Sequence, residues 1–384
     1  MDDRQRRLLV GAYRELGWDG KEIAAFVHFS RASVSGIVSD LRAQGDRNDE
    51  VRYPGGGRDL EWLAAQMRST PHEERLHKTF NLDDDQGMVL PAESTHHQHG
   101  ALRLATVARV AAIRLHQYFR EQSARGKSRF VVGVSFGTTC ERIVAELQSI
   151  MARAGARDRF GHVTVFPLTG EMDVDPDTIV DEGRNARPLR YGAGSRVDRL
   201  ALALHADSVV YNSFPAWIPI PGRDDKGSLK QRHDRLKEDF ELYYGFKRIY
   251  SGEHSLLRTA DVIITAIGSV EESVRTYLKL TGQAGNTRVI EESLDQVAGD
   301  ISCCLLPKRR GTTIPLSDFF LAPALWDFKK VVDAAREDDG KFGLLVAAAG
   351  RAKAATLKAL FESELRQNHL CIDTELCEAL SDSS

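Results

Sequence analysis

Hydrophobic residues between positions 4 and 45 recur at the spacing of an α-helix, and the pattern is interrupted twice. We therefore expect three short helices in this segment. Gly17 and Gly20 bracket the first turn, Ser30 is a suitable N-cap for the third helix, and Gly45 is a suitable C-cap. The apolar positions of the three helices are Leu8, Leu9, Ala12, Tyr13 and Leu16, then Ile23, Ala24 and Val27, then Val34, Ile37, Val38 and Leu41.

A different pattern begins after this segment. Residues 53–58 read Tyr-Pro-Gly-Gly-Gly-Arg, and three consecutive glycines lose too much entropy on ordering to favour a regular element. An amphipathic helix is expected over residues 59–68. The predicted organisation is a helical domain over residues 1–52, a glycine-rich linker over 53–58, and a large domain over 59–384.

Beyond residue 100 the chain alternates between helix and strand patterns. A long helix is expected over 101–124. Short apolar runs follow it, separated by helix-like segments, which is typical of a parallel sheet covered on both faces. We therefore predict an α/β fold, doubly wound and mostly parallel. The predicted strands are Phe130–Val134, Val163–Phe166, Ser208–Tyr211, Val262–Ala266, Leu344–Ala348 and Leu370–Ile372.

Composition is ordinary for a globular protein, with 42% hydrophobic and 28% charged residues and a formal net charge of −3. No run of 18 apolar residues is present, so no membrane span is expected. The first residues, Met1 to Gln5, are polar and charged and have no apolar segment, which argues against a signal peptide. These features predict a cytoplasmic protein.

Cysteine and histidine patterns give no clear metal or cofactor site. The chain has five cysteines and no C-x-x-C pair, so reduced thiols are the simplest interpretation, including for the vicinal Cys303 and Cys304. His96, His97 and His99 lie in a polar stretch, at a spacing that suits a solvated loop better than a helical metal site. We predict no metal and no cofactor.

The second and third predicted helices have the form of a helix-turn-helix. Ala24 is small enough to let the two helices cross closely, and the start of the third helix is rich in groups that contact phosphates and base edges. However, residues 2–45 contain seven Lys and Arg against six Asp and Glu, so contact with protein instead of DNA stays an alternative. The predicted DNA-binding residues are Ser30, Arg31, Ser33, Ser35 and Arg42.

Residues 130–143 form a strand, a Gly/Ser/Thr turn and a helix start. This arrangement directs backbone N–H groups and the positive end of a helix dipole at the space above the strand. Thr138 and Thr139 add hydroxyl donors, and Gly137 allows an anion to approach closely. The pattern favours a phosphate site, although such turns often carry Gly and Thr only for capping. It lacks the Gly-Lys-Ser/Thr ending of a Walker motif.

Residues 344–354 repeat this order of strand, glycine turn and helix start. Lys353 lies in the first helical turn, where a cation is unfavourable for the helix itself. A nearby anion would explain its presence, and an ordinary surface lysine is the alternative. Other predicted strands also end in small or acidic residues, namely Gly268, Asp300 and Asp373. Because ligands of open α/β sheets bind at the carboxyl ends of strands, these motifs converge on one edge.

Together these motifs resemble the SorC family of bacterial regulators over nearly the whole chain. The resemblance rests on the helix-turn-helix, on Gly-x-x-x-Gly-Thr-Thr at 133–139, and on further motifs in the family's order. These are Gly268 at a strand end, Gly299-Asp300, Gly350-x-x-Lys353, and Asp373 followed by Glu375. The resemblance implies a sensor related in fold to sugar-phosphate isomerases, a phosphorylated sugar or similar metabolite as effector, and a homo-oligomer, either dimer or tetramer.

Carried over to this sequence, the resemblance implies that Gly137, Thr138, Thr139 and Lys353 hold the phosphate. Asp300 and Asp373 would lie at the hydroxyl end of the ligand. The predicted effector-binding residues are Gly133, Ser135, Gly137, Thr138, Thr139, Gly268, Asp300, Lys353 and Asp373.

The chain departs from the family pattern in three places. His28 replaces the usual turn glycine of the helix-turn-helix, and Gly36 replaces a usual arginine of its second helix. The segment 217–258 is longer than the family pattern and carries a charged run from Arg223 to Glu241, which reads as a solvated helix or as a lid over the ligand.

The sequence thus predicts a transcription regulator, a repressor or an activator, that binds double-stranded operator DNA and responds to a phosphorylated small molecule. An isomerase- or deaminase-like enzyme is an alternative, with Asp373, Asp300 and Glu141 as candidate bases. A sensor whose N-terminal helices bind protein is a second alternative. We favour a binding protein over an enzyme, because a DNA-binding domain has no role in simple metabolic turnover.

Overall fold

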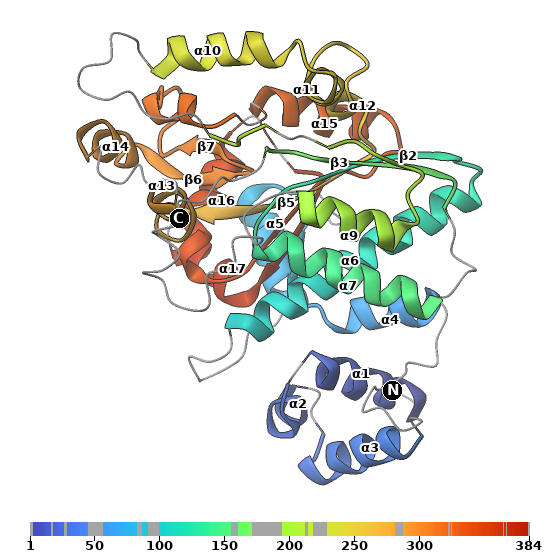
Figure 1. Cartoon of the computed structure of the whole chain (residues 1–384). Helices are drawn as coiled ribbons and strands as arrows, with labels where there is room; N and C mark the ends of the chain where they lie inside the picture. Colours follow the sequence, from blue (N-terminus) through green and yellow to red (C-terminus); the bar gives the residue numbers. More distant parts are fainter. Residues whose placement is uncertain are drawn as a thin grey trace.

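Three helices form a small unit at the N-terminus of the computed structural model (Figure 1). They are α1 (Asp3–Glu15), α2 (Gly20–Phe26) and α3 (Arg31–Gln44), as the periodicity predicts. Their apolar faces pack together through Tyr13, Ile23 and Val34. The structure describes residues 3–16, 18–26, 29–44, 57–82, 87–90, 100–154, 160–170, 194–211, 214–217, 229–280, 287–321, 323, 325–363, 365 and 367–382.

Side-chain caps fix the starts of α2 and α3. Asp19 accepts hydrogen bonds from the backbone N–H groups of Lys21 and Glu22, at 2.7 and 2.8 Å, and Glu22 accepts one from the Asp19 N–H. These backbone hydrogen bonds lower the pKa of Asp19. Ser30 accepts a bond of 3.0 Å from the Ser33 N–H, which confirms it as the N-cap of α3.

The predicted linker is only partly described. Residues 51–56 lie outside the described part of the chain, and α4 begins at Gly57 and continues to Gln66. The last two residues of the predicted linker, Gly57 and Arg58, open this helix. Glycine is tolerated there because the first turn of a helix is not its interior. The predicted histidine loop at 91–99 also lies outside the described residues.

Parallel strands form the centre of the large domain, in the order β1-β9-β8-β5-β2-β3-β4. All six strands expected from the sequence are present, and the predicted α/β fold is confirmed. The strands are β1 (Gly87–Leu90), β2 (Arg129–Val134), β3 (His162–Pro167), β4 (Ser208–Val209), β5 (Val262–Ser269), β8 (Gly343–Ala348) and β9 (His369–Asp373).

Both faces of the sheet are buried, so alternate residues of one strand enter opposite cores. Leu345 and Ala347 of β8 pack on one side, while Leu344 and Val346 pack on the other. Helices α6 (Gly100–Ala124), α7 (Thr138–Ala154) and α9 (Gly194–Leu204) cover the first side (Figure 1). The second is covered by α5 (Thr70–Phe80), α11 (Tyr244–Tyr250), α12 (Leu256–Thr259), α15 (Leu325–Glu337), α16 (Ala354–Glu362) and α17 (Thr374–Asp382).

An antiparallel hairpin, β6 (Val297–Ile301) and β7 (Cys304–Pro307), branches from the end of β5. Gly299 and Asp300 were predicted as a motif, but no strand was predicted there. The hairpin packs with four helical segments into a separate small core that contains Phe136 and Phe319. These segments are η3 (Val270–Val274, a π-helix), α13 (Arg275–Leu280), α14 (Thr287–Leu294) and η4 (Pro315–Phe319).

The segment that the sequence marked as unusually long contains α10 (Leu229–Phe240). This helix lies at the surface and contacts η4 (Figure 1). Its charged residues are mostly exposed, which agrees with a solvated helix. Residues 218–228 lie outside the described part of the chain.

The N-terminal unit contacts the large domain through α6. The Trp18 indole N–H donates to the Thr106 hydroxyl at 3.3 Å. The buried Arg109 guanidinium binds Glu15 of α1 at 3.2 Å and Glu146 of α7 at 2.5 Å. One cation on α6 therefore bridges a carboxylate of the N-terminal unit and a carboxylate of the sensor.

Replacing Arg109 by methionine should destabilise the protein by about 3 kcal/mol, because two largely buried carboxylates would lose their shared cation. Urea denaturation followed by circular dichroism measures the change. Lys230→Met is the matched control, since Lys230 forms an exposed pair with Asp234, and it should leave the midpoint unchanged. Equal midpoints for the two variants would contradict the importance of the bridge.

Candidate functional site

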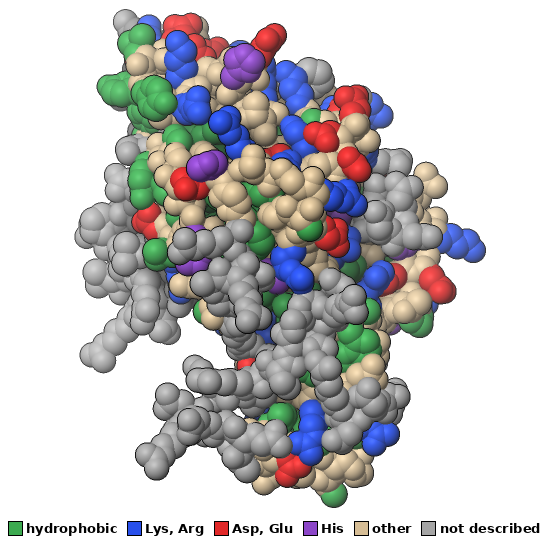
Figure 2. Space-filling model, turned by 90° about the vertical axis from the view of Figure 1, so that its right-hand side faces the viewer, with side chains coloured by type: hydrophobic (Ala, Val, Ile, Leu, Met, Phe, Trp, Pro, Cys, Tyr) green, Lys and Arg blue, Asp and Glu red, His purple; other side chains and the backbone are tan. Residues whose placement is uncertain are grey.

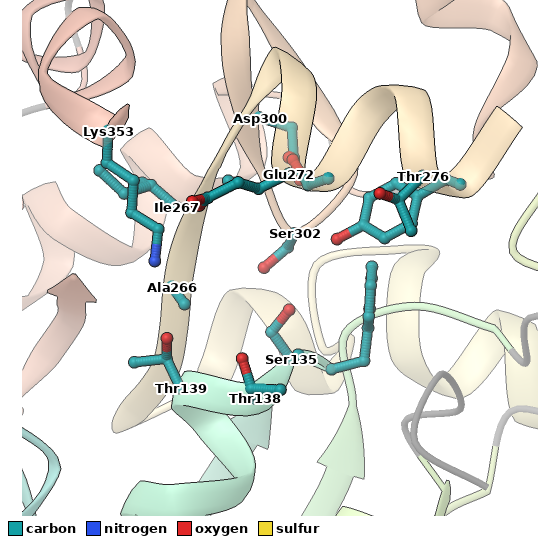
Figure 3. Close-up of a pocket in the computed structure, with 15 residues that line it drawn as sticks. Ser135, Thr138, Thr139, Ala266, Ile267, Glu272, Thr276, Asp300, Ser302 and Lys353 are labelled. Carbon is teal, nitrogen blue, oxygen red and sulfur yellow. The ribbon is translucent and has the colours of Figure 1, made fainter. Parts of the chain in front are cut away.

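A cavity of about 250 Å³ lies where the carboxyl ends of β2 and β5 meet the small core (Figure 3). Parallel pairing of these two strands places both ends at the same edge of the sheet. The walls come from the turn after β2, the first turn of α7, the end of β5, η3, the β6–β7 hairpin and the turn before α16. The lining residues are Ser135, Phe136, Gly137, Thr138, Thr139, Ala266, Ile267, Gly268, Glu272, Ser273, Thr276, Tyr277, Asp300, Ser302 and Lys353.

One wall of the cavity is the N-terminus of α7, a helix of 17 residues. Its backbone N–H groups and helix dipole favour an anion in this position. Gly137 adopts a φ of +105°, a conformation that a side chain would strain, and nothing lies within 4 Å of the position a Cβ would take. The turn is therefore open toward the cavity, and Thr138 and Thr139 direct their hydroxyls into it (Figure 3).

Among the described residues that line this cavity, Lys353 supplies the only cationic side chain. Its ammonium points into the space that Thr138 and Thr139 also face (Figure 3). Burial lowers the pKa of Lys353, and the negative charges of Glu272, Asp373 and Asp300 partly oppose this effect. A desolvated ammonium beside a helix N-terminus is a suitable site for a phosphate or carboxylate group.

Asp300 supplies a buried carboxyl at the opposite wall. Its Oδ1 lies 2.5 Å from the Ser273 hydroxyl, and its Oδ2 accepts a bond of 3.0 Å from the Cys303 N–H. Burial raises the pKa of Asp300, while the Ser273 and Cys303 hydrogen bonds and the Lys353 charge lower it. The carboxyl is thus held in one orientation, with lone pairs left to accept hydrogen bonds from hydroxyl groups of a ligand.

Seven of the nine predicted effector-binding residues line the cavity, and two lie outside it. Gly133 is a packing position, because a Cβ there would come within 2.7 Å of Ile263 and Phe166. Asp373 caps the following helix, accepting hydrogen bonds of 3.1 Å from the Gly350 N–H and 3.0 Å from the Leu376 N–H. The cavity is therefore shaped by these two residues but not lined by them.

Several lining residues were missed by the sequence analysis, including Glu272, Ser273, Thr276 and Tyr277. They follow β5 through η3, whose first turn is capped by the Ser269 hydroxyl. Strand endings at Gly268 and Ser269 marked the place, but a π-helical turn changes which side chains face inward. Ser302 was also missed, and its hydroxyl lies 2.7 Å from that of Thr265.

Of the three candidate bases for an enzyme, only Asp300 lines the cavity. Glu141 pairs with Arg196 and Arg199 of α9, and Asp373 serves as a helix cap. Among the described residues, no group of three or more His, Cys, Asp or Glu could hold a metal ion. In the same part of the chain, no helix has the length and apolarity needed to cross a membrane.

Four of the five predicted DNA-binding residues are exposed in the N-terminal unit. Ser30, Arg31, Ser33 and Ser35 are exposed around the first turns of α3. Arg42 lies on α3, but its side chain falls outside the described residues. Gly36 is also exposed, and a Cβ there would meet nothing within 4 Å. The serines and Arg31 are therefore accessible to a partner that approaches α3.

Comparison with solved structures identifies the fold as that of SorC- and DeoR-family transcription regulators. The full-length sorbitol operon regulator SorC from Klebsiella pneumoniae matches with a TM-score of 0.55 and 16% identity, over 99% of each chain. A DeoR family transcriptional regulator from Listeria monocytogenes matches with a TM-score of 0.54 and 16% identity, over 81% of this chain and 98% of that one.

A transcriptional regulator from Streptococcus pneumoniae gives a TM-score of 0.55 at 14% identity, over 83% of this chain and 98% of that one. No protein-family model matches the sequence. No curated protein matches it either. The fold that the resemblance predicted is thus confirmed, and the match to the Klebsiella protein extends through the N-terminal helices.

Replacing Lys353 by methionine should weaken binding of inorganic phosphate at least tenfold, because the cavity loses its cation. Isothermal titration calorimetry measures the affinity. Arg351→Met is the matched control, since Arg351 is exposed, pairs with Asp382 and does not line the cavity. Equal affinities for the two variants would contradict a role for Lys353.

Phosphate binding should also be coupled to proton uptake. Burial lowers the pKa of Lys353 in the unliganded protein, and a bound dianion should raise it again. At a pH between the pKa of Lys353 without ligand and its pKa with ligand bound, the protein takes up protons when the ligand binds. Above about pH 8, where a phosphoryl group with a second pKa of about 6 is already dianionic, calorimetry in buffers of different ionisation enthalpy should detect this uptake. The uptake should be absent from the Lys353→Met protein.

Proposed function

We propose that this protein is a DNA-binding transcription regulator whose DNA affinity is set by a phosphorylated small molecule. The observations that support the proposal are, in one chain, a helix α3 with an exposed start in the N-terminal unit and an anion-suited cavity at the carboxyl edge of an α/β sheet. A regulator of this kind acts in the cytoplasm, where it meets chromosomal DNA. The similar proteins of known structure are described as transcription regulators, which supports the proposal.

The effector should carry one phosphoryl group and several hydroxyl groups. Thr138, Thr139 and Lys353 suit the phosphoryl end. Asp300, Ser302 and Thr276 offer hydrogen-bonding groups toward the other end (Figure 3). A cavity of about 250 Å³ suits a metabolite the size of a sugar phosphate.

In the N-terminal unit, α3 would enter the major groove of double-stranded DNA. Ser30, Arg31, Ser33 and Ser35, with Arg42 further along the helix, would contact phosphates and base edges. Because a helix-turn-helix usually reads two half-sites of a palindrome, we propose that the chain acts as a dimer or tetramer. Whether it represses or activates depends on the position of its operator.

The two halves are linked by the ion pairs of Arg109. Thr138 and Thr139, at the start of α7, line the cavity, and Glu146 on the same helix binds Arg109. Arg109 in turn binds Glu15 at the end of α1. A ligand that displaces α7 would therefore change the partners of Arg109, and the orientation of the N-terminal unit with them.

DNA binding can be tested by selecting fragments of the source genome that the protein retains, then measuring gel shifts on the selected fragment. Arg31→Ala should weaken binding about tenfold and reduce the salt dependence by about one counterion. Arg248→Ala, an exposed change on α11, is the control and should bind normally. Retention of no fragment at low salt would contradict the proposal and favour a protein partner. Turnover of a sugar phosphate would favour the enzyme alternative.

The link through Arg109 predicts a separate phenotype for Glu15→Gln. The variant should still bind DNA and the effector, because Glu15 lines neither the cavity nor the exposed face of α3. The change in DNA affinity caused by the effector should fall several-fold, since one of the Arg109 ion pairs is lost. Titrating the effector into the protein–DNA complex measures this change. A wild-type response would contradict coupling through this pair.

A further inference from the structure

A second cavity, of about 500 Å³, lies at the opposite edge of the sheet, where the parallel strands begin. It is formed by the second half of α6, the end of α15, the loop before β8 and the start of β9. Figure 2 shows the molecule from the side on which α6 ends, the right-hand side of Figure 1. The lining residues are Arg114, Gln117, Tyr118, Glu121, Gln122, Arg125, Ala335, Arg336, Asp339, Lys341, Phe342, Asn368 and His369. We call this cavity the amino-edge cleft.

Two polar atoms of lining residues are buried without a hydrogen-bonding partner in the described part of the chain. They are Nε of Arg114 and Nδ1 of His369. Buried polar groups in folded proteins are nearly always paired, so two orphans in one cavity require an explanation. Burial, together with the Arg114 charge, lowers the pKa of His369 to about 3, and a hydrogen bond with the Phe342 backbone only partly opposes this effect, so the ring is neutral.

The cleft has an excess of positive charge. Four basic side chains line it, namely Arg114, Arg125, Arg336 and Lys341, against the two carboxylates of Glu121 and Asp339. Arg336 also pairs with Asp333, which does not line the cleft, at 3.7 Å. Arg125 pairs with Asp339 at 3.4 Å, but the two side chains are 60% and 95% exposed, so the pair neutralises little. Arg114 and Lys341 form no ion pair with any residue that the structure describes.

Helix termini explain only part of this charge. Arg125 and Arg336 lie at the C-terminal ends of α6 and α15, where cations are favourable for the helix. Arg114 lies nearly three turns before the end of α6, so the helix dipole gives no reason for a cation there. It sits instead beside the start of β9, where His369 stacks on Phe342 with ring centroids 3.8 Å apart.

From this arrangement we propose that the amino-edge cleft is a second ligand site, which binds a multiply charged phosphoryl group. Arg114 supplies a guanidinium, whose planar donors match phosphate oxygens, and the half-buried Lys341 supplies a second cation. The volume exceeds that of the carboxyl-edge cavity, so a diphosphate fits as well as a monophosphate.

The site differs from the proposed effector cavity in every lining residue. Both sites nevertheless contact elements that reach the N-terminal unit. Arg114 lies on α6 five residues after Arg109, which binds Glu15. An anion held at the amino edge would therefore act on the helix that supports the N-terminal unit.

Calorimetric titration with inorganic pyrophosphate tests the proposal in the full-length chain. In the Lys353→Met background, which lacks the cation of the other cavity, one binding site should remain. Adding Arg114→Gln should weaken pyrophosphate binding at least tenfold. Adding Lys341→Gln instead should weaken it several-fold. Lys341 lies near the surface, so its replacement also tests the site if the Arg114 variant fails to fold. Arg114→Lys, which keeps the charge, should restore part of the affinity.

Glu121→Gln is the matched control, because it removes an exposed carboxylate from the same cleft and should strengthen pyrophosphate binding. No binding by the Lys353→Met protein would overturn the proposal, as would unchanged affinity in both cleft variants. If instead Lys353→Met leaves all binding intact while the cleft variants weaken it, the proposed effector cavity fails and the second site stands.

Discussion

Parallel pairing of the central strands is the constraint on which the rest of this structure depends. Because β1, β9, β8, β5, β2, β3 and β4 all run in one direction, every strand ends at one edge of the sheet and begins at the other. Helices that follow strands therefore present their N-termini at the carboxyl edge, as α7 does. The same constraint collects the ends of α6 and α15 at the amino edge.

Much of this fold could be predicted from the sequence, because its strands are buried on both faces. Such strands are continuously apolar, and five of the six predicted strands stood out in this way between helical patterns, whereas β4 is exposed or half-buried. β1 was not predicted, since Gly87–Leu90 is only four residues long and pairs with β9, near the far end of the chain. The β6–β7 hairpin was missed for a related reason, because its apolar residues serve a small separate core.

The candidate site was predictable where it follows a strand and unpredictable where it depends on tertiary contacts. Thr138, Thr139 and Lys353 could be found because a glycine turn before a helix has a recognisable sequence. Glu272 and Tyr277 could not, because a π-helical turn decides how they face the cavity. Gly133 was misassigned as effector-binding. The sequence alone does not distinguish a glycine that leaves room for a ligand from one that leaves room for a core side chain such as Phe166.

The double pairing of Arg109 limits which N-terminal units this sensor could accept. A foreign helix-turn-helix without an acidic residue at the position of Glu15 would remove one of the two ion pairs of Arg109 and keep the one with Glu146. It would also need a donor in place of the Trp18 indole, or the Thr106 hydroxyl would lose this hydrogen bond. Exchange of DNA-binding modules, in evolution or in the construction of biosensors, is therefore restricted to units that match both contacts.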